Sequence, residues 1–256
     1  MTARYNYQLP VLMYHRVIRK RNEAGMHNIF ILEKKLRQQF DYLKKNNFKT
    51  LTFRDLNEQV VTNTSEKKVI LSFDDGYADN YTLLFPLLKE YGFTAVVFLV
   101  SREKQNTWGI KEGEPAIPLL DTLQIKEMDS YGIEFGAHTC SHPLLPELRE
   151  EEARLEIMEC KKDLESLLGK PTLSFGYPFG ELNDKLKAIV AEAGYTYAVA
   201  TFSGPFSMQE DLLQIRRIEV ASQTLMLSFK RKASGFYFKP SVLSLLPIPN
   251  RFKGYF

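Results

Sequence analysis

The chain has 256 residues, 44% of them hydrophobic and 25% charged, values typical of globular proteins rather than disordered or fibrous ones. Its longest purely apolar run, residues 95–100, is far shorter than the ~20 residues that a membrane-spanning helix needs. The short, proline-interrupted run 9–14 does not look like a signal peptide, so we expect a cytoplasmic chain. The net charge of +3 is weak support for a nucleic-acid partner, and we expect none.

Short β-type runs alternate with longer helical patterns, which is typical of βα units around a parallel sheet. The expected strands cover residues 9–14, 48–51, 68–73, 94–99, 133–137, 173–176, 195–200 and 214–220. The expected helices cover residues 32–45, 80–91, 122–131, 150–168 and 183–192. The polar, aperiodic stretch 101–118 is expected to be a long loop. We therefore expect one α/β domain, either a closed barrel or an open doubly wound sheet.

The last part of the chain is basic and aromatic. Residues 229–256 contain six Lys or Arg and seven Phe or Tyr but no acidic residue, and we expect them to form a separate segment after a domain of residues 1–228. Such a segment can lie in the interface of an anionic membrane. The alternative is that its rings pack on the domain and its charges are solvated.

Two adjacent carboxylates follow a predicted buried strand, because residues 68–73 lead directly into Asp74, Asp75 and Gly76. In parallel α/β proteins, ligand sites form at the carboxyl ends of strands. Adjacent like charges raise one another's pKa unless a cation separates their roles. An Asp-Asp-Gly sequence is also a common turn, so both interpretations stay open at this point.

Two histidines, His138 and His142, follow the predicted strand 133–137. Two imidazoles four residues apart can reach one metal ion, and their neutral nitrogens suit zinc or another divalent transition metal. Only four histidines occur in the chain, and two of them are in this motif. With Asp75 as a third ligand, we expect a metal site with zinc as the first choice. Cys140, inside the motif, is expected to be a buried or idle thiol.

These motifs resemble those of the polysaccharide deacetylases, carbohydrate esterase family 4 with the NodB homology domain. Residues 72–76, Ser-Phe-Asp-Asp-Gly, are similar to the first family motif, and residues 138–142, His-Thr-Cys-Ser-His, to the second. Residues 12–16 and 177–180, Leu-Met-Tyr-His-Arg and Tyr-Pro-Phe-Gly, are similar to the opening and the third motif of one subgroup. The resemblance covers roughly residues 9–222. It implies a distorted (β/α) barrel of seven or eight strands and metal-dependent removal of N-acetyl groups from amino sugars of a polysaccharide or a lipid-linked glycan.

Carried over residue by residue, the resemblance implies a role for each motif residue. Asp75, His138 and His142 would hold the metal ion. Asp74 would be the general base that takes a proton from the attacking water. The backbone N–H of Phe179 would stabilise the oxyanion.

The sequence departs from the family pattern at two positions. Gly176 stands where the third motif usually begins with an arginine that orients the catalytic aspartate, and Arg216 or Arg217 is the expected replacement. One of these two can equally be a solvated surface charge. The family's late histidine is absent, because no histidine follows His142. We therefore expect His15 to be the general acid, with a purely structural histidine as the alternative.

The motifs specify attack at a carbonyl carbon but do not specify the acyl group. A deformylase or another N-acyl hydrolase on the same fold is therefore an alternative. A carbohydrate-binding pseudoenzyme is a second one, given Gly176 and the missing late histidine. The complete set of Asp74, Asp75, His138 and His142 disfavours the pseudoenzyme, since a binding module needs no base.

Overall fold

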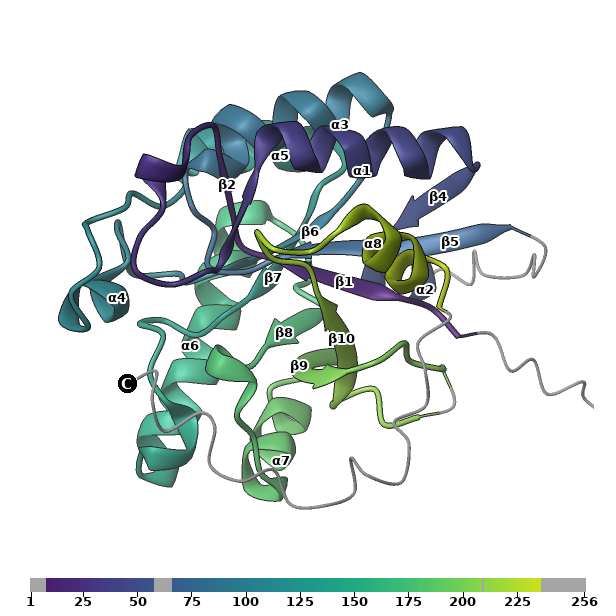
Figure 1. The fold of residues 1–256 in the computed structure, drawn as a ribbon. Coiled ribbons are helices and arrows are strands. Elements are labelled where there is room, and N and C mark those ends of the chain that lie inside the picture. The colour runs from purple at the N-terminus through teal and green to yellow at the C-terminus, as the bar shows by residue number, and fades with distance from the viewer. Residues whose placement is uncertain (1–7, 58–65, 209, 236–256) are drawn as a thin grey trace, which may run out of the picture.

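The computed structural model describes residues 8–57, 66–208 and 210–235, and it shows a parallel β-barrel surrounded by helices (Figure 1). The strands of the main sheet are β1 (Val11–Tyr14), β4 (Phe48–Leu51), β5 (Lys67–Phe73), β6 (Val96–Leu99), β7 (Glu134–Ala137), β8 (Ser174–Gly176), β9 (Tyr197–Ser203) and β10 (Ile215–Glu219). Seven of them close a ring in the order β1, β10, β9, β8, β7, β6, β5, because β1 pairs with both β10 and β5. β4 pairs with the first residues of β5, outside the ring. The expected (β/α) barrel is thus confirmed, and the open sheet is excluded.

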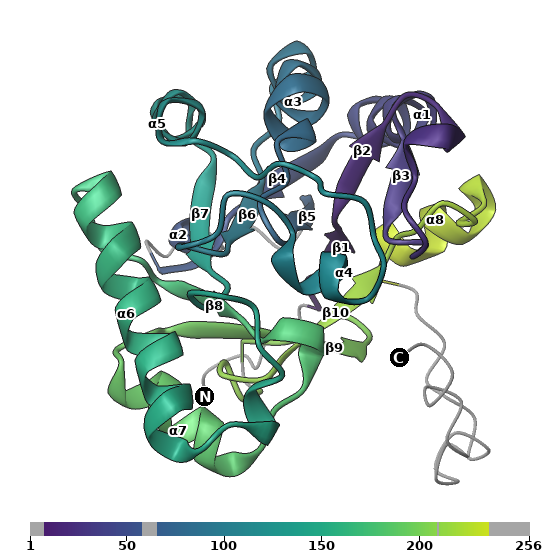
Figure 2. The ribbon, with the colours of Figure 1, turned by 90° about the vertical axis from the view of Figure 1, so that its left-hand side faces the viewer.

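The helices are α1 (Glu33–Lys45), α2 (Phe53–Asn57), α3 (Phe85–Tyr91), α4 (Thr107–Lys111), α5 (Thr122–Tyr131), α6 (Glu150–Leu168), α7 (Asp184–Glu192) and α8 (Met226–Ala233). Figure 2 shows the long helices around the strands, with α4 in front of them. Sequence signals explain the ends of the long helices. Asp121 and Gln124 form a capping box before α5, and α6 ends at Gly169, whose φ of +67° closes it.

The structure adds elements that the periodicity of the sequence did not predict. Residues 101–118 were expected to be a loop, but they contain α4, which is only five residues long. A second, two-stranded sheet pairs β2 (Arg16–Ile18) with β3 (Phe30–Leu32). The helix expected at 80–91 begins with a π-helical turn, Asn80–Leu84, before α3. Elements of three to five residues are too short to show a period, which explains why they were missed.

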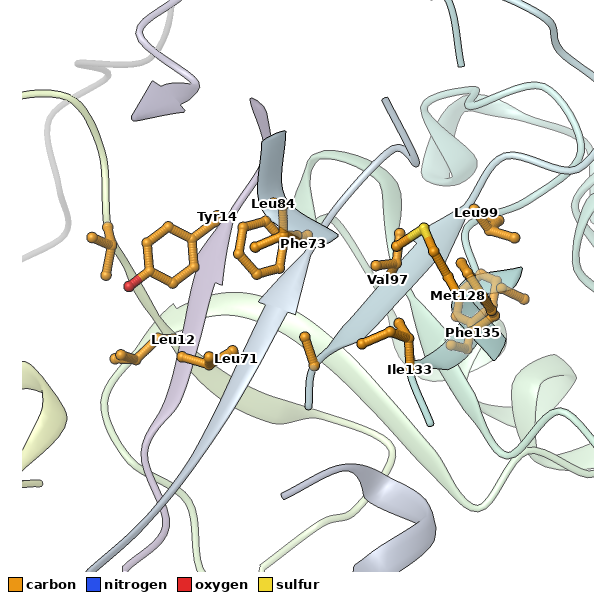
Figure 3. Close-up of a cluster of buried hydrophobic side chains, with 14 of the residues drawn as sticks. Leu12, Tyr14, Leu71, Phe73, Leu84, Val97, Leu99, Met128, Ile133 and Phe135 are labelled. Atoms are coloured by element: carbon orange, nitrogen blue, oxygen red, sulfur yellow. The ribbon is translucent and has the colours of Figure 1, made fainter. Parts of the chain in front are cut away.

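Strand side chains alternate between the barrel interior and the helical layer. The outward set forms the main hydrophobic core, part of which is shown in Figure 3: Leu12, Tyr14, Leu71, Phe73, Val97, Leu99 and Phe135, with Met128 of α5. The inward set fills the barrel with apolar side chains such as Val11, Ile70, Val96 and Val199. Buried polar side chains lie at both ends of the strands: Lys68, Glu134 and Ser174 at the amino ends, and Asp74, Asp75 and His138 at the carboxyl ends. The residues of the sequence motifs belong to the second group, so the candidate site is at the carboxyl ends.

Helix α8 crosses the boundary that the sequence suggested between residues 228 and 229. Phe229 is fully buried, and its ring meets that of Tyr42 on α1 at 6.1 Å. The first residues of the basic, aromatic segment therefore pack on the barrel, while residues 236–256 lie outside the described residues. Within the described ranges, no helix combines the length and the apolar character needed to cross a bilayer.

Candidate active site

The two aspartates point in different directions because the chain turns sharply at the end of β5. The N–H of Asp74 donates to the carbonyl of Tyr14 at 2.9 Å, which continues the pairing of β5 with β1. Asp75 then adopts a φ of +71° and Gly76 a φ of +72°. A Cβ at Gly76 would lie 2.6 Å from the Leu99 side chain, so this turn requires glycine. The turn places the two carboxylates in different surroundings.

Asp75 lies against the two motif histidines, and all three side chains are buried. Its Oδ1 is 3.4 Å from Nε2 of His138 and 3.3 Å from Nε2 of His142. One ligand atom from each residue can be chosen so that all three lie within 4.8 Å of one another. The structure thus brings together the three residues expected to hold a metal ion.

The chemistry of these three groups fits a divalent cation. Nδ1 of His138 lies 2.7 Å from the carbonyl oxygen of Gly176, and because a carbonyl only accepts, Nδ1 must carry the proton. Nε2 of a neutral His138 is then an acceptor that faces an acceptor oxygen of Asp75. A neutral His138 therefore meets Asp75 favourably with a metal ion between the two atoms, whereas a protonated His138 can donate to Asp75 directly. The Gly176 carbonyl fixes the tautomer as outer partners of metal-binding histidines do.

The protonation states agree with a metal site. Burial lowers the pKa of the His142 imidazole more than the neighbouring Asp75 raises it, which favours the neutral, metal-binding form. Burial alone would raise the pKa of the Asp75 carboxyl, but hydrogen bonds from His138 and His142, which require a proton on each Nε2, outweigh it and hold that pKa well below its usual range. A metal ion at the same position would supply the positive charge in place of those protons. Asp75 therefore offers a charged carboxylate to a cation.

Asp74 points into the barrel and meets Arg217. The guanidinium binds both carboxylate oxygens, with Nη1 at 2.6 Å from Oδ1 and Nη2 at 2.8 Å from Oδ2. Its Nε donates to the carbonyl of Ala200 at 3.0 Å. Burial would raise the pKa of Asp74, but the charge of Arg217 and then that of His15 lower it below its ordinary value. Arg216 points away from the site and pairs with Glu210, so of the two candidates only Arg217 contacts the aspartate.

His15 lies at the end of β1, with Nε2 3.7 Å from Oδ2 of Asp74. Its side chain is 20% exposed, whereas that of Asp74 is 4% exposed. The side-chain amide of Asn80 donates to the backbone carbonyl of His15 at 3.1 Å. The structure therefore brings His15 to the same end of the barrel as the aspartates, on the side open to solvent.

Phe179 follows β8 in a tight turn, with a φ of +58°. Its backbone N–H donates to no other group in the described part of the chain, and the N–H of Gly180 instead bonds Tyr177. The Phe179 ring meets the imidazole of His142 edge-on at 4.7 Å. The expected oxyanion donor thus lies beside His142, one of the three candidate metal ligands, with a free N–H.

A groove of about 430 Å³ opens beside His142. Its walls include Trp108 of α4, Leu144 and Phe179. The Trp108 ring stacks on the His142 imidazole, with 4.4 Å between centroids and 23° between planes. No pattern in the sequence indicates that Trp108 reaches the site. The chain's single tryptophan in an otherwise polar stretch was the one available signal.

Backbone strain gathers at this end of the barrel. Among the described residues, five non-glycine residues have a positive φ, and four of them are Asp75, Thr139, His142 and Phe179. Such conformations cost on the order of 1–3 kcal/mol each and concentrate at functional sites. Their clustering marks the same group of residues as the motifs do.

The family model described as polysaccharide deacetylase matches residues 61–198, more than half of the chain. The chain belongs to the polysaccharide deacetylase family. The matched region holds both aspartates, both motif histidines and the Phe179 turn. His15 and Arg217 lie outside it, so their placement in the site rests on the geometry given above.

Individual relatives agree with the family. YxkH of Bacillus subtilis (strain 168), which its name assigns to the polysaccharide deacetylases, is 27% identical over 216 residues, covering 84% of this chain and 72% of its own. Poly-beta-1,6-N-acetyl-D-glucosamine N-deacetylase of Staphylococcus aureus is 24% identical over 222 residues, covering 78% of this chain and 71% of its own. The structure of Streptococcus pyogenes deacetylase PplD in complex with acetate matches with a TM-score of 0.76 at 26% identity, covering 89% of this chain and 98% of that chain. This polysaccharide deacetylase therefore has the NodB-type barrel and is an amide hydrolase, as its motifs predicted.

Proposed function

We propose that this deacetylase removes N-acetyl groups from the amino sugars of a polysaccharide, using a divalent metal ion, with zinc as the first choice. The observation that carries the proposal is the convergence of Asp75, His138 and His142 within 4.8 Å at the carboxyl ends of the strands. The Staphylococcus aureus relative is named for a polymer of N-acetylglucosamine, which supports a substrate of that class. Two nitrogens and one carboxylate are a common ligand set of catalytic zinc.

The roles of the surrounding groups follow from their geometry. A divalent cation at the three ligands would lower the pKa of a water molecule and polarise the substrate carbonyl. Asp74, kept ionised by Arg217, is placed to accept the proton of the attacking water. The free N–H of Phe179 can donate to the acetyl oxygen as negative charge develops there.

His15 completes the proposed reaction as the general acid. The water oxygen bonds to the acetyl carbon while its proton passes to Asp74. The C–N bond then breaks as His15 gives a proton to the amine nitrogen, which leaves acetate and a free amino sugar. The partial exposure of the His15 side chain on the solvent side of Asp74 supports this assignment.

Metal analysis combined with one variant tests the proposal. The purified protein should hold about one zinc per chain, a chelator should abolish hydrolysis, and added zinc should restore it. Asp74→Asn should keep the metal and lose roughly 10² or more in rate. Active protein that contains no metal and is unaffected by chelators would contradict the metal site. If Asp74→Asn lost its metal, the roles assigned to Asp74 and Asp75 would have to be exchanged. If the protein removes formyl groups faster than acetyl groups, the deformylase alternative is favoured. If it binds metal but hydrolyses neither, the carbohydrate-binding pseudoenzyme is favoured.

A lipid-linked glycan, a peripheral membrane contact and a cytoplasmic location stay predictions. Leu225 and Leu227, at the start of α8, are 71% and 65% exposed, and the last turn of the same helix is basic, which supports contact with an anionic surface. Sedimentation with anionic liposomes tests the contact. Binding should weaken with added salt and with deletion of residues 236–256. Protein that stays in the supernatant at low salt would favour a glycan without a lipid carrier.

A further inference from the structure

The segment between β7 and the ligand His142 is held from outside the barrel by a carboxylate of α6. Oε2 of Glu156 accepts hydrogen bonds from the backbone N–H groups of Cys140 at 2.8 Å and Ser141 at 3.0 Å. Its Oε1 accepts one from the Ser141 hydroxyl at 2.7 Å. Hydrogen bonds to an ionised acceptor are roughly twice as strong as neutral ones. Glu156 therefore binds three donors on the two residues that directly precede the metal ligand.

This segment needs such support because its backbone is strained. Thr139 has a φ of +68° and His142 a φ of +60°, a region that a β-branched residue such as Thr139 rarely adopts. One internal bond helps, in which the N–H of His142 donates to the Thr139 hydroxyl at 2.9 Å. Strained residues persist only where their surroundings over-determine them. A strained segment that loses its supports will relax, and the side chain at its end will move with it.

The supports on the two sides of the segment are different. Its carbonyl groups are held by the chain after β6, where the N–H of Ser101 donates to Thr139 at 3.1 Å and that of Arg102 to Cys140 at 3.0 Å. The N–H groups of Cys140 and Ser141, by contrast, reach Glu156, and no backbone carbonyl of the described residues accepts them. Removing the Glu156 carboxylate would leave these donors unpaired, although Cys140 is only 5% exposed.

We propose that Glu156 is a positioning residue that holds His142 in the geometry needed to bind the metal ion. The inference rests on the proposed metal site and extends it to a residue that touches neither metal nor substrate. His138 needs no such support, because it follows β7 directly and bonds the Gly176 carbonyl. Outer partners of metal ligands typically contribute 10–100-fold in metal affinity.

Zinc affinity of three full-length variants tests this inference, measured by competition with a chromophoric chelator. Glu156→Ala should bind zinc about 10–100-fold more weakly than the wild type. Glu156→Gln keeps one acceptor oxygen for three donors, so its zinc affinity should lie between those of the wild type and Glu156→Ala. The matched control is Glu151→Ala, at an exposed position of the same helix, and it should bind zinc like the wild type.

Each outcome separates the inference from the function on which it rests. Activity of Glu156→Ala should recover towards the wild-type level at saturating zinc, because the catalytic groups are intact. Equal zinc affinity in Glu156→Ala and Glu151→Ala would overturn the inference while leaving the metal site in place. If Glu156→Ala does not fold, Glu156→Gln decides in the same way, since affinity equal to the control overturns the inference. A wild type that binds no zinc would overturn the metal site itself, and the inference with it.

Discussion

Replacing Arg217 by methionine should destabilise the protein far more than the same change at the neighbouring Arg216. The Arg217 side chain is fully buried and makes two short bonds to the buried Asp74 carboxylate. Removing one partner of a buried ion pair leaves an uncompensated charge and costs about 3–5 kcal/mol. The Arg216 side chain is 39% exposed, and an exposed pair such as that with Glu210 contributes about 0–1 kcal/mol. The expected gap in unfolding free energy is therefore about 2–5 kcal/mol.

Urea unfolding at pH 7, followed by circular dichroism, measures this gap. A chelator should be present in every sample, so that metal binding does not add to stability. The double variant Asp74→Asn, Arg217→Met should regain part of the loss, because the orphaned carboxylate is gone. Equal losses in Arg217→Met and Arg216→Met would refute the reasoning. So would a double variant as unstable as the sum of its single changes.

Three further predictions concern His15, the cysteines and Asp79. His15→Ala should lose amide hydrolysis far more than hydrolysis of an activated ester, whose leaving group needs no proton; equal losses would indicate a structural role. Burial raises the pKa of the thiols to about 11 at Cys140 and about 12 at Cys160, so neither should react with a thiol reagent at pH 7 until the protein unfolds. Burial raises the pKa of Asp79 from 3.8 to about 6, more than its bonds to Val17 and Arg16 lower it. The folded protein binds the Asp79 proton more tightly than the unfolded chain does. The contribution of this protonated carboxyl to the free energy of unfolding is therefore lost as pH rises from about 4 to about 6. Relative to the wild type, Asp79→Asn should therefore gain about 2–3 kcal/mol of unfolding free energy between pH 4 and pH 7, and a constant difference would contradict this pKa.

The convergence of Asp75, His138 and His142 could be predicted from the sequence because their motifs follow strands whose ends are marked by composition. The choice between Arg216 and Arg217 could not be made in this way. Ile215 and Arg217 share one face of β10, and Arg216 and Ile218 share the other. Both faces of a barrel strand are buried, so alternation does not reveal which arginine points inward.

Trp108 and Glu156 were missed for a different reason. Each reaches the site from a separate element, and no local pattern records which strand end that element will face. The positive φ values of Asp75, Thr139 and His142 were equally hidden, since none of these residues is a glycine. Such features arise from tertiary contacts that override local preference.

The closure of the barrel links the assembly of the site to the completion of the fold. The bond between Asp74 and Arg217 joins residues 143 positions apart, and β10 is the last strand of the ring, inserted between β9 and β1. Contacts of such long range form slowly, because a long loop must close before they stabilise anything. Asp74 follows β5, which pairs with β1, so its arginine arrives only with the strand that fills the gap between β1 and β9. The Asp74 carboxylate gains its partner in the same step that closes the barrel, so a chain that ended before residue 215 would contain the three candidate metal ligands but no Arg217 to orient Asp74.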